Sequence, residues 1–314
     1  MSGTISSEAA AAIATMEAKI AGADDLPAPD DQAGWDEIFG RQEAAVGALN
    51  ARTLERYSPG LRTRQVAGVD IVVVTPVGAA ATGARIIFLH GGGYALFSAH
   101  SSLFASVPLA HDLGLELWSI DYPRAPRSKA DTTVPCVTRV LAALLADAGE
   151  VLLVGDSAGG GLALAATLAL RAGGPRPRAL ALWSPWCDVT AAGASHRWLA
   201  AADPVLRYPG SLERAALAYA PSQRHGDPDV SPIHARYDAT FPPTLIQCGT
   251  REILLSDCVR LYRRLDEAGC PVQLDVHEGM PHSFQAIAPE LPESARARRK
   301  VSRFFEAAVS RALR

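Results

Sequence analysis

A serine flanked by glycines, between two apolar segments of different pattern, constrains the fold of this chain more than any other local feature. Gly155-Asp156-Ser157-Ala158-Gly159 follows the apolar run 151–154 and precedes an alanine- and leucine-rich stretch over 160–172. The short run is typical of a buried strand, and the longer stretch is typical of a helix. Glycines beside the serine avoid Cβ clashes in a sharp turn, so the pattern predicts strand, strained turn and helix, with Ser157 at the apex.

Such a turn would make Ser157 a nucleophile. The turn lifts the hydroxyl out of the sheet, and the N-terminus of the following helix favours developing negative charge. A purely structural turn is the alternative, because a G-x-S-x-G match can arise by chance in a chain with 26 glycines. The strand before the motif and the helix after it favour a catalytic serine.

A second glycine motif precedes the serine. His90-Gly91-Gly92-Gly93-Tyr94 follows the apolar run 86–89. Three consecutive glycines cost conformational entropy, which indicates that the backbone must approach another group closely. Beside a serine nucleophile, that group is the oxyanion of a tetrahedral intermediate. A flexible loop is the plainer alternative, and the motif lacks the patterns of phosphate-binding loops.

Together the two motifs resemble the HGGG and GDSAGG signatures of the hormone-sensitive-lipase-like esterases, which belong to the α/β-hydrolase superfamily. Arg124 departs from the order Y-R-L-A-P-E that is usual there. Within the family, the chain looks most similar to bacterial esterases described as monoterpene lactone hydrolases. The resemblance spans roughly residues 60 to 312 and includes Asp121-Tyr122, Ala125-Pro126, Ser184-Pro185-Trp186, Ser231-Pro232, Pro242-Pro243 and Met280-Pro281-His282-Ser283-Phe284.

The apolar pattern predicts an α/β fold. Strands are expected at 61–66, 71–74, 86–89, 115–120, 151–154, 179–183, 244–248 and 272–276. From the third strand onward helical patterns separate them, at 103–113, 134–145, 160–170, 258–268 and 295–313. This alternation predicts a mostly parallel eight-stranded sheet with helices on both faces, and the short first link suits an antiparallel pair. The α/β-hydrolase fold fits this order, with its site at the carboxyl ends of the strands.

Residues 1–55 and 189–233 break the alternation, and we expect them to form a helical cap over a core of residues 56–188 and 234–314. The first region has helical patterns at 9–20 and 35–54, and the second has them at 195–202 and 212–220. An irregular connection of this length is more often a functional lid than a linker. The resemblance also implies a cap. Helices that only pack against the core are the alternative.

A serine nucleophile needs a base and a third group that orients the base. The superfamily order is serine, acid, histidine, so the base should follow the last strands. His277 falls at the end of a predicted strand and is expected to pack or to face solvent. His282 lies in a loop with glycine and proline, matches the family's histidine, and is therefore the expected base. His90 is expected to hold its own loop through backbone hydrogen bonds.

The acid is the least regular part of the match. The family usually has aspartate in a D-x-L-x-D-E pattern, whereas this chain reads Glu252-Ile253-Leu254-Leu255-Ser256-Asp257. Aligning the leucines places Glu252 on the triad position, and glutamate serves as the acid in some hydrolases of this type. Asp257 is the rival, although we expect it on the first turn of the next helix, where acids are ordinary partners of the helix dipole.

The resemblance implies an oxyanion hole made by the N–H groups of Gly92, Gly93 and Ala158, with a slip to Gly91 as the alternative. Asp156 is expected to be structural. The candidate pocket residues are aromatic or apolar side chains, each of which alone is more often a core residue: Trp35, Phe39, Tyr94, Phe97, Trp186, Trp198, Leu206 and Tyr208.

Charge and composition indicate which binding partners and cofactors are not expected. The net charge is −3 and the basic residues are scattered, so neither nucleic acid nor an anionic membrane is expected. The N-terminus lacks a signal-peptide pattern, and no apolar run is long enough for a membrane span. The five cysteines form no C-x-x-C pair or metal-ligand cluster, and their odd number favours reduced thiols in a cytoplasmic protein. No metal or cofactor is expected.

The predicted function is that of a serine carboxylesterase acting on short-chain acyl esters, with lactones as a further candidate class of small-molecule substrate. The same triad could instead hydrolyse an amide or a small acetylated metabolite. A catalytically silent binding protein on this fold is a third alternative, which the intact serine and histidine disfavour. A homodimer through the strand at 272–276 is compatible with the sequence, but no feature requires it.

Overall fold

The computed structural model describes residues 4–21, 25–81, 83–147, 149–170 and 174–312. Over these residues one eight-stranded sheet has the order β1-β2-β4-β3-β5-β6-β7-β8. β2 pairs antiparallel with β1, and the remaining sheet is mostly parallel, as the sequence predicts. The antiparallel pairing of β2 with β4 is an addition that the sequence does not predict. The strands are β1 (Gly60–Val66), β2 (Val69–Thr75), β3 (Arg85–Leu89), β4 (Glu116–Ile120), β5 (Val151–Asp156), β6 (Ala179–Trp183), β7 (Thr244–Arg251) and β8 (Val272–Pro281).

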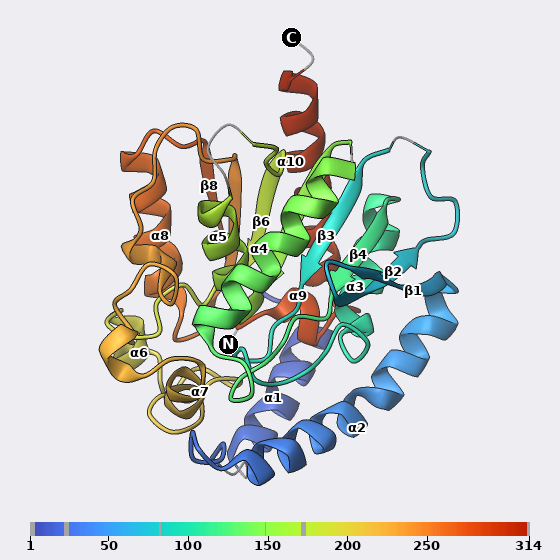
Figure 1. The fold of residues 1–314 in the computed structure, drawn as a ribbon. Coiled ribbons are helices and arrows are strands. Elements are labelled where there is room, and N and C mark those ends of the chain that lie inside the picture. Colours follow the sequence, from blue (N-terminus) through green and yellow to red (C-terminus); the bar gives the residue numbers. More distant parts are fainter. Residues whose placement is uncertain (1–3, 22–24, 82, 148, 171–173, 313–314) are drawn as a thin grey trace.

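Helices cover both faces of this sheet (Figure 1). One face carries α4 (Ala130–Asp147), α5 (Ala158–Ala169) and α8 (Leu255–Glu267), and the other carries α3 (Leu103–Leu113) and α10 (Pro292–Ala312). The remaining helices are α1 (Ser7–Ala21), α2 (Gln32–Tyr57), α6 (Ser195–Trp198), α7 (Ser211–Tyr219), α9 (Phe284–Ile287) and the 3₁₀ turns η1 (Ser222–Arg224) and η2 (Pro232–His234).

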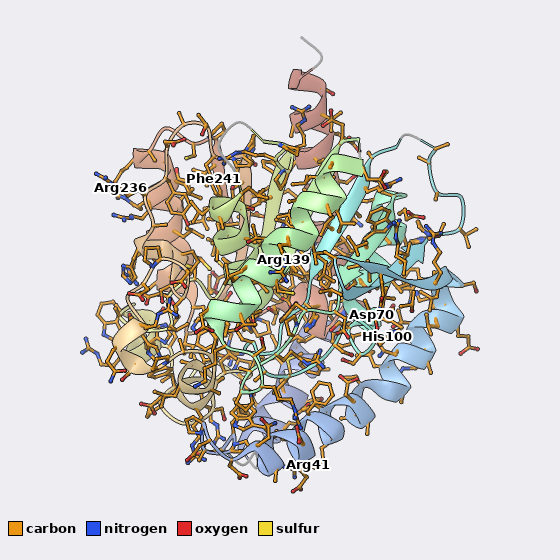
Figure 2. All side chains as sticks on the ribbon, viewed as in Figure 1. Arg41, Asp70, His100, Arg139, Arg236 and Phe241 are labelled. Carbon is orange, nitrogen blue, oxygen red and sulfur yellow. The ribbon has the colours of Figure 1, made fainter. Side chains whose placement is uncertain are left out.

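The two-residue period of the strands divides the core into two apolar layers. In β2, Ile71 and Val73 pack in the layer beneath α4, α5 and α8, whereas Val72 and Val74 pack beneath α3 and α10. Successive strand side chains point to opposite faces, so a sheet covered on both sides needs apolar residues at every position. Side chains fill the space between sheet and helices (Figure 2).

The end of the sheet brings two distant segments together. β8 is longer than the sequence predicts, running past His277 to Pro281, which pairs with Arg251 of β7. The register shifts between Gly249 and Arg251, and a Cβ atom on Gly249 would collide with the backbone of Met280. Because paired strands end at neighbouring points, the residues that follow them, Glu252 and His282, leave the sheet side by side.

The N-terminal helices and the segment 189–233 lie at the carboxyl ends of the parallel strands. In Figure 1, α1, α2, α6 and α7 occupy the end of the molecule toward which the β3 arrow points. Asn50 of α2 accepts a hydrogen bond from Phe104 N (2.8 Å) and donates one to Ser101 O (2.8 Å), which fixes α2 on α3. Helices of the N-terminal segment and of the segment 189–233 therefore cover the carboxyl ends of the strands, where a site is expected.

Candidate active site

Ser157 occupies a strained turn between β5 and α5. Its φ of 53° and ψ of −117° lie in a region that residues other than glycine rarely adopt. Cβ atoms on the flanking Gly155 and Gly159 would collide with the backbone of Gly159 and Leu89, respectively. The turn therefore requires glycine on both sides of the serine, as the sequence predicts, and it presents the Ser157 hydroxyl at the tip of β5.

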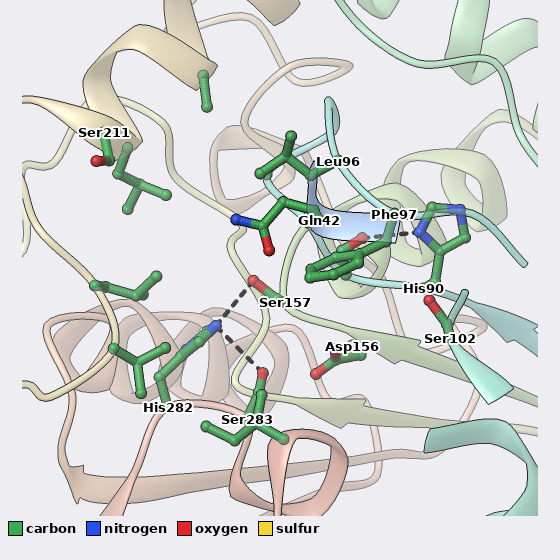
Figure 3. Close-up of a pocket in the computed structure, with 18 of the residues that line it drawn as sticks. Gln42, His90, Leu96, Phe97, Ser102, Asp156, Ser157, Ser211, His282 and Ser283 are labelled. Atoms are coloured by element: carbon green, nitrogen blue, oxygen red, sulfur yellow. Dashed lines mark hydrogen bonds between the residues drawn. The ribbon is translucent and has the colours of Figure 1, made fainter. Parts of the chain in front are cut away.

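A hydrogen-bonded chain links Ser157, His282 and Glu252. His282 Nε2 lies 2.9 Å from Ser157 Oγ, and its Nδ1 lies 2.9 Å from Glu252 Oε2 (the first contact is drawn in Figure 3). All three residues are buried, and Glu252 is fully enclosed. With Nδ1–H donating to the carboxylate, Nε2 is the acceptor for the serine O–H, which is the tautomer that a general base requires.

Glu252 is held by a second set of donors. Its Oε1 accepts hydrogen bonds from Gly249 N at 2.6 Å and from Ser184 Oγ at 2.9 Å. Ser184 Oγ in turn accepts from Ser283 N at 3.0 Å, beside His282. Both carboxylate oxygens are therefore bonded, and a glutamate reaches His282 from the position at which the family usually has aspartate.

The charge around His282 favours the protonated imidazole. Burial lowers the pKa of His282, but the hydrogen bond and negative charge of Glu252 outweigh it, with further contributions from Asp203 and Asp156, so that the pKa is raised. Burial also raises the pKa of Asp156 to about 6. The Asp156 carboxylate lies where a Cβ on Gly91 would collide with it, which explains the glycine at that position.

The glycine loop after β3 lines the same cavity as Ser157. Gly92 and Gly93 have φ values of 109° and 61°, a region that glycine adopts without strain. Among the described residues, no acceptor is bonded to the N–H groups of Gly92, Gly93 or Ala158. Gly92 and Gly93 line the same cavity as Ser157, and Ala158 directly follows the serine. Unpaired N–H groups near a nucleophile are what the stabilisation of an oxyanion requires.

His90 supports this loop, as the sequence predicts. Its Nδ1 lies 2.8 Å from Gly91 O, and its ring stacks on Tyr122 with ring centroids 4.1 Å apart. Tyr122 Oη donates to His90 O at 2.7 Å. Complete burial lowers the pKa of His90 to about 4, so the ring is neutral at physiological pH and donates from Nδ1 to the loop.

Comparison with known proteins places this geometry in a family. A family model described as α/β hydrolase fold matches residues 86–286, which include the serine, the glycine loop, the acid and the histidine. The chain belongs to the α/β-hydrolase family. It is 36% identical over 237 residues to an acetyl-hydrolase of Streptomyces hygroscopicus (74% of this chain, 78% of the relative) and 31% identical over 232 residues to an esterase of Acinetobacter venetianus (72% and 76%).

Similar solved structures show to which group of α/β hydrolases the chain is related. The chain superposes on a hormone-sensitive lipase from a metagenome library with a TM-score of 0.85 and 28% identity, covering 98% of this chain and 100% of that one. An esterase of the bacterial hormone-sensitive lipase family gives a TM-score of 0.83 and 29% identity, with the same coverage. This α/β hydrolase is therefore a hormone-sensitive-lipase-like carboxylic ester hydrolase, and the comparisons favour an enzyme over a silent binding protein.

A cavity of about 370 Å³ opens onto Ser157 and His282 in this hydrolase. Its walls are mostly apolar and come from the core and from the two segments at the carboxyl ends of the strands. The core contributes Phe88, Phe104 and Ala105. The N-terminal segment and the segment 189–233 supply Ile20, Leu26, Ile38, Gln42, Val205, Leu206, Arg207, Ser211, Leu212 and Ala215. Such a pocket suits a small, largely apolar substrate.

Two of the predicted pocket residues line this cavity, Leu206 and Phe97. Tyr94 and Trp186 lie behind the wall: both are buried, and Tyr94 Oη donates to Trp186 O at 2.9 Å. The prediction that these two aromatic side chains line the pocket is corrected: neither is part of the cavity wall, and Trp186 lies against Gly93, which is.

Four other aromatic candidates also lie outside the lining. Trp198 is 72% exposed on α6. Trp35 is buried and donates its indole N–H to Ala28 O at 2.8 Å, which fixes the start of α2. Phe39 packs under the guanidinium of Arg124, 4.5 Å from the ring centroid. Tyr208 packs against the ring of His196, 5.7 Å away.

The sequence reasoning missed the helical side chains that do line the cavity. Ile38 and Gln42 are four residues apart on α2 and therefore share one helix face, while Arg41 projects from the outer side of the helix (Figure 2). Figure 3 shows the Gln42 amide directed toward Ser157. The four-residue spacing indicates a shared helix face, but the sequence does not indicate which face of α2 turns toward the serine.

Asp257 also needs a correction. The sequence predicts an ordinary acid on the first turn of a helix, and it does lie on the first turn of α8. However, its side chain is fully buried, with Oδ2 2.8 Å from His196 Nε2 and Oδ1 3.3 Å from Arg260 Nη1. Burial raises the pKa of Asp257. Asp257 therefore joins α8 to α6 and makes no contact with His282.

Two further searches cover only the part of the chain that the structure describes. In those residues, no group of three or more His, Cys, Asp or Glu side chains is placed to hold a metal ion. Within the same residues, no helix combines the length and the apolar character that crossing a membrane would need.

Proposed function

We propose that this enzyme hydrolyses small, short-chain acyl esters with Ser157 as nucleophile, His282 as general base and Glu252 as the acid that orients His282. The observation that carries the proposal is the unbroken chain of hydrogen bonds from Ser157 Oγ to Glu252 at the floor of the apolar cavity. The unpaired N–H groups of Gly92 and Gly93, which line the same cavity, and of Ala158, which follows the serine, support a site for the oxyanion. We further propose that residues 1–55 and 189–233 form the cap that shapes the pocket.

The reaction follows from these positions. His282 Nε2 takes the proton of Ser157 as Oγ attacks the ester carbonyl carbon, and Glu252 stabilises the imidazolium that forms. The carbonyl oxygen becomes an oxyanion, which the N–H groups of Gly92, Gly93 and Ala158 bind. His282 then protonates the leaving alkoxide, and an acyl group remains on Ser157. Water, deprotonated by His282, then attacks the carbonyl carbon of this acyl-enzyme. The bond from that carbon to Ser157 Oγ breaks, His282 returns the proton to Oγ, and the carboxylic acid is released.

Turnover of p-nitrophenyl esters, combined with labelling by a fluorophosphonate, tests this proposal. We expect hydrolysis of the butyrate ester and a single covalent adduct on Ser157, located by mass spectrometry. A panel of C2 to C12 esters and lactones then defines the substrate class. An enzyme that binds these esters without releasing the alcohol would contradict the proposal.

The pH dependence should report the environment of His282. The reaction needs neutral His282, and the pKa of this group is raised above its ordinary value of 6.5. A raised pKa means that the neutral form is lost at a higher pH, so kcat/KM should fall as the pH decreases through a value above about 6.5. Initial rates with p-nitrophenyl butyrate, monitored at a pH-independent wavelength, measure this acidic limb of the pH profile of kcat/KM. An acidic limb with its midpoint below about pH 6 would contradict a base whose imidazolium is stabilised by Glu252.

A substitution in the cap should change the preference for substrate length. Ile38 of α2 lines the cavity, so Ile38→Trp places a larger side chain in the space that a long substrate needs. We expect kcat/KM for octanoate to fall by about tenfold or more relative to acetate, since such pockets discriminate by shape. Arg41→Trp, on the outer side of the same helix, is the matched control and should leave the ratio unchanged. Equal ratios in both variants would remove Ile38 from the substrate path.

A further inference from the structure

The turn that carries Glu252 is bonded to the segment 189–233 along its whole length. Arg251 Nε donates to Ala202 O at 3.3 Å, and Ile253 N donates to Asp203 Oδ2 at 2.8 Å. The turn and the segment also exchange hydrogen bonds between two serines: Ser256 N donates to Ser195 Oγ and Ser195 N donates to Ser256 Oγ, both at 2.9 Å. The acid is therefore held from outside the sheet by the same segment that walls the pocket.

Asp203 occupies the centre of this contact. Its side chain is buried, with 5% of the residue's surface exposed. Oδ1 accepts from Val205 N at 2.8 Å and from Leu206 N at 2.9 Å, and Oδ2 accepts from Ile253 N. Val205 and Leu206 line the cavity, and Ile253 directly follows Glu252. One carboxylate thus connects a wall of the substrate pocket to the backbone of the candidate acid.

The bond to Ile253 distinguishes Asp203 from an ordinary turn residue. Aspartate and asparagine side chains commonly accept hydrogen bonds from the N–H groups two and three residues onward, and the Oδ1 contacts alone would fit that role. The Oδ2 contact crosses to the loop after β7, fifty positions along the chain. A carboxylate can accept at both ends, whereas an amide can accept at only one.

The charge of Asp203 also acts on the site. Three carboxylates face His282: Glu252 from the end of β7, Asp156 from the end of β5 and Asp203 from the segment 189–233. Glu252 bonds directly to the ring, whereas Asp203 acts through space and favours the protonated imidazole. In a buried site such an interaction is weakly screened.

We propose that Asp203 is a positioning residue of the segment 189–233. Its carboxylate sets the orientation of Glu252 and holds the pocket wall at Val205 and Leu206. Its negative charge supports the positive charge that forms on His282. This inference rests on the proposed function, because it assigns Glu252 and His282 their roles in catalysis. The Asp203 carboxylate thus links the pocket wall to the loop of the candidate acid by direct hydrogen bonds.

Asp203→Asn tests the proposal. The amide keeps the shape but must turn its NH₂ group either toward Ile253 N or toward the N–H groups of Val205 and Leu206. We expect kcat to fall by about tenfold to a hundredfold, since small misplacements of catalytic groups have effects of this size. The acidic limb of kcat/KM should move to lower pH by about half a pH unit, because a negative charge that favours the imidazolium is lost.

Asp188→Asn is the matched control. Asp188 is another buried aspartate, at the junction of β6 with the same segment, and its Oδ2 bonds to Arg260 Nη1 at 2.6 Å rather than to the acid-bearing turn. Loss of this buried charge should lower the melting temperature and leave the acidic limb at its wild-type pH. A shift of the limb in Asp188→Asn equal to that in Asp203→Asn would overturn the proposal, since a general loss of stability would then explain both.

The outcomes separate this proposal from the proposed function. If wild-type enzyme is labelled at Ser157 and active, but Asp203→Asn has kcat within twofold of wild type and an unchanged limb, Asp203 has no positioning role. If Asp203→Asn does not fold, amide hydrogen exchange of the wild-type enzyme decides the question. The N–H groups of Leu206 and Ile253 should then be protected and should exchange together, because they share one carboxylate. Rapid exchange at Ile253 alone would contradict the inference.

Discussion

Ser157→Ala should abolish ester hydrolysis and leave the fold intact. Removal of the nucleophile from a serine hydrolase costs about 10⁶-fold in kcat, since the other groups act only through it. The substitution deletes one hydroxyl and keeps the Cβ atom in the strained turn, so the melting temperature should change little. Steady-state rates with p-nitrophenyl butyrate and a thermal melt of the same preparation measure the two effects.

The fluorophosphonate label provides the control for this substitution. Wild-type enzyme should carry one adduct on Ser157, and Ser157→Ala should carry none. The five cysteines are the other conventional nucleophiles, and all of them are free thiols that are buried. Burial raises the pKa of Cys187 well above its usual range, which keeps the thiol protonated and unreactive. Residual turnover in Ser157→Ala, with the label on a cysteine, would show that the nucleophile lies elsewhere.

The local parts of the site could be predicted from the sequence because local chemistry determines them. Gly155 and Gly159 are required by contacts within a few residues of Ser157 or with the adjacent strand, so the motif and the geometry imply each other. The same holds for the glycine loop after His90, where positive φ values demand glycine. The alternation of apolar runs with helical patterns similarly determined the sheet, because a parallel strand needs a crossover helix to return.

The pocket wall could not be predicted in this way, because tertiary packing decides it. Trp198 and Ile38 are both apolar and both lie in helices of the predicted cap, yet Trp198 is largely exposed and Ile38 is buried and lines the cavity. The sequence contains no signal for how α2 and the segment 189–233 dock on the sheet. Asp203 was missed for the same reason, since its significance depends on a bond to a residue fifty positions away.

The most discriminating test of the site concerns its acid. Glu252→Gln should lower kcat by about 10⁴-fold, the effect of the equivalent amide substitution in a Ser-His-Asp triad. The wild-type carboxylate accepts from His282 Nδ1 on one oxygen and from Gly249 N and Ser184 Oγ on the other. Glutamine has a single acceptor oxygen, so its NH₂ group must face one of these donors. If it faces His282, the ring adopts the tautomer that cannot accept the serine proton.

Glu252→Asp should cause an intermediate loss, because the carboxylate withdraws by one methylene from a ring that lies 2.9 Å away, although its charge remains. Asp257→Asn is the matched control, at a carboxylate five residues further along the chain on the first turn of α8. It should keep kcat within about tenfold of wild type and lower the melting temperature, since it breaks a buried contact with His196 and Arg260 instead of one with the base. The reverse order, with Asp257 essential and Glu252 dispensable, would require His282 to be oriented from α8. In that arrangement the acid would not be Glu252, whose two carboxylate oxygens accept from His282, Gly249 and Ser184. The register shift between β7 and β8, which brings Glu252 and His282 side by side, would then have no part in placing the acid.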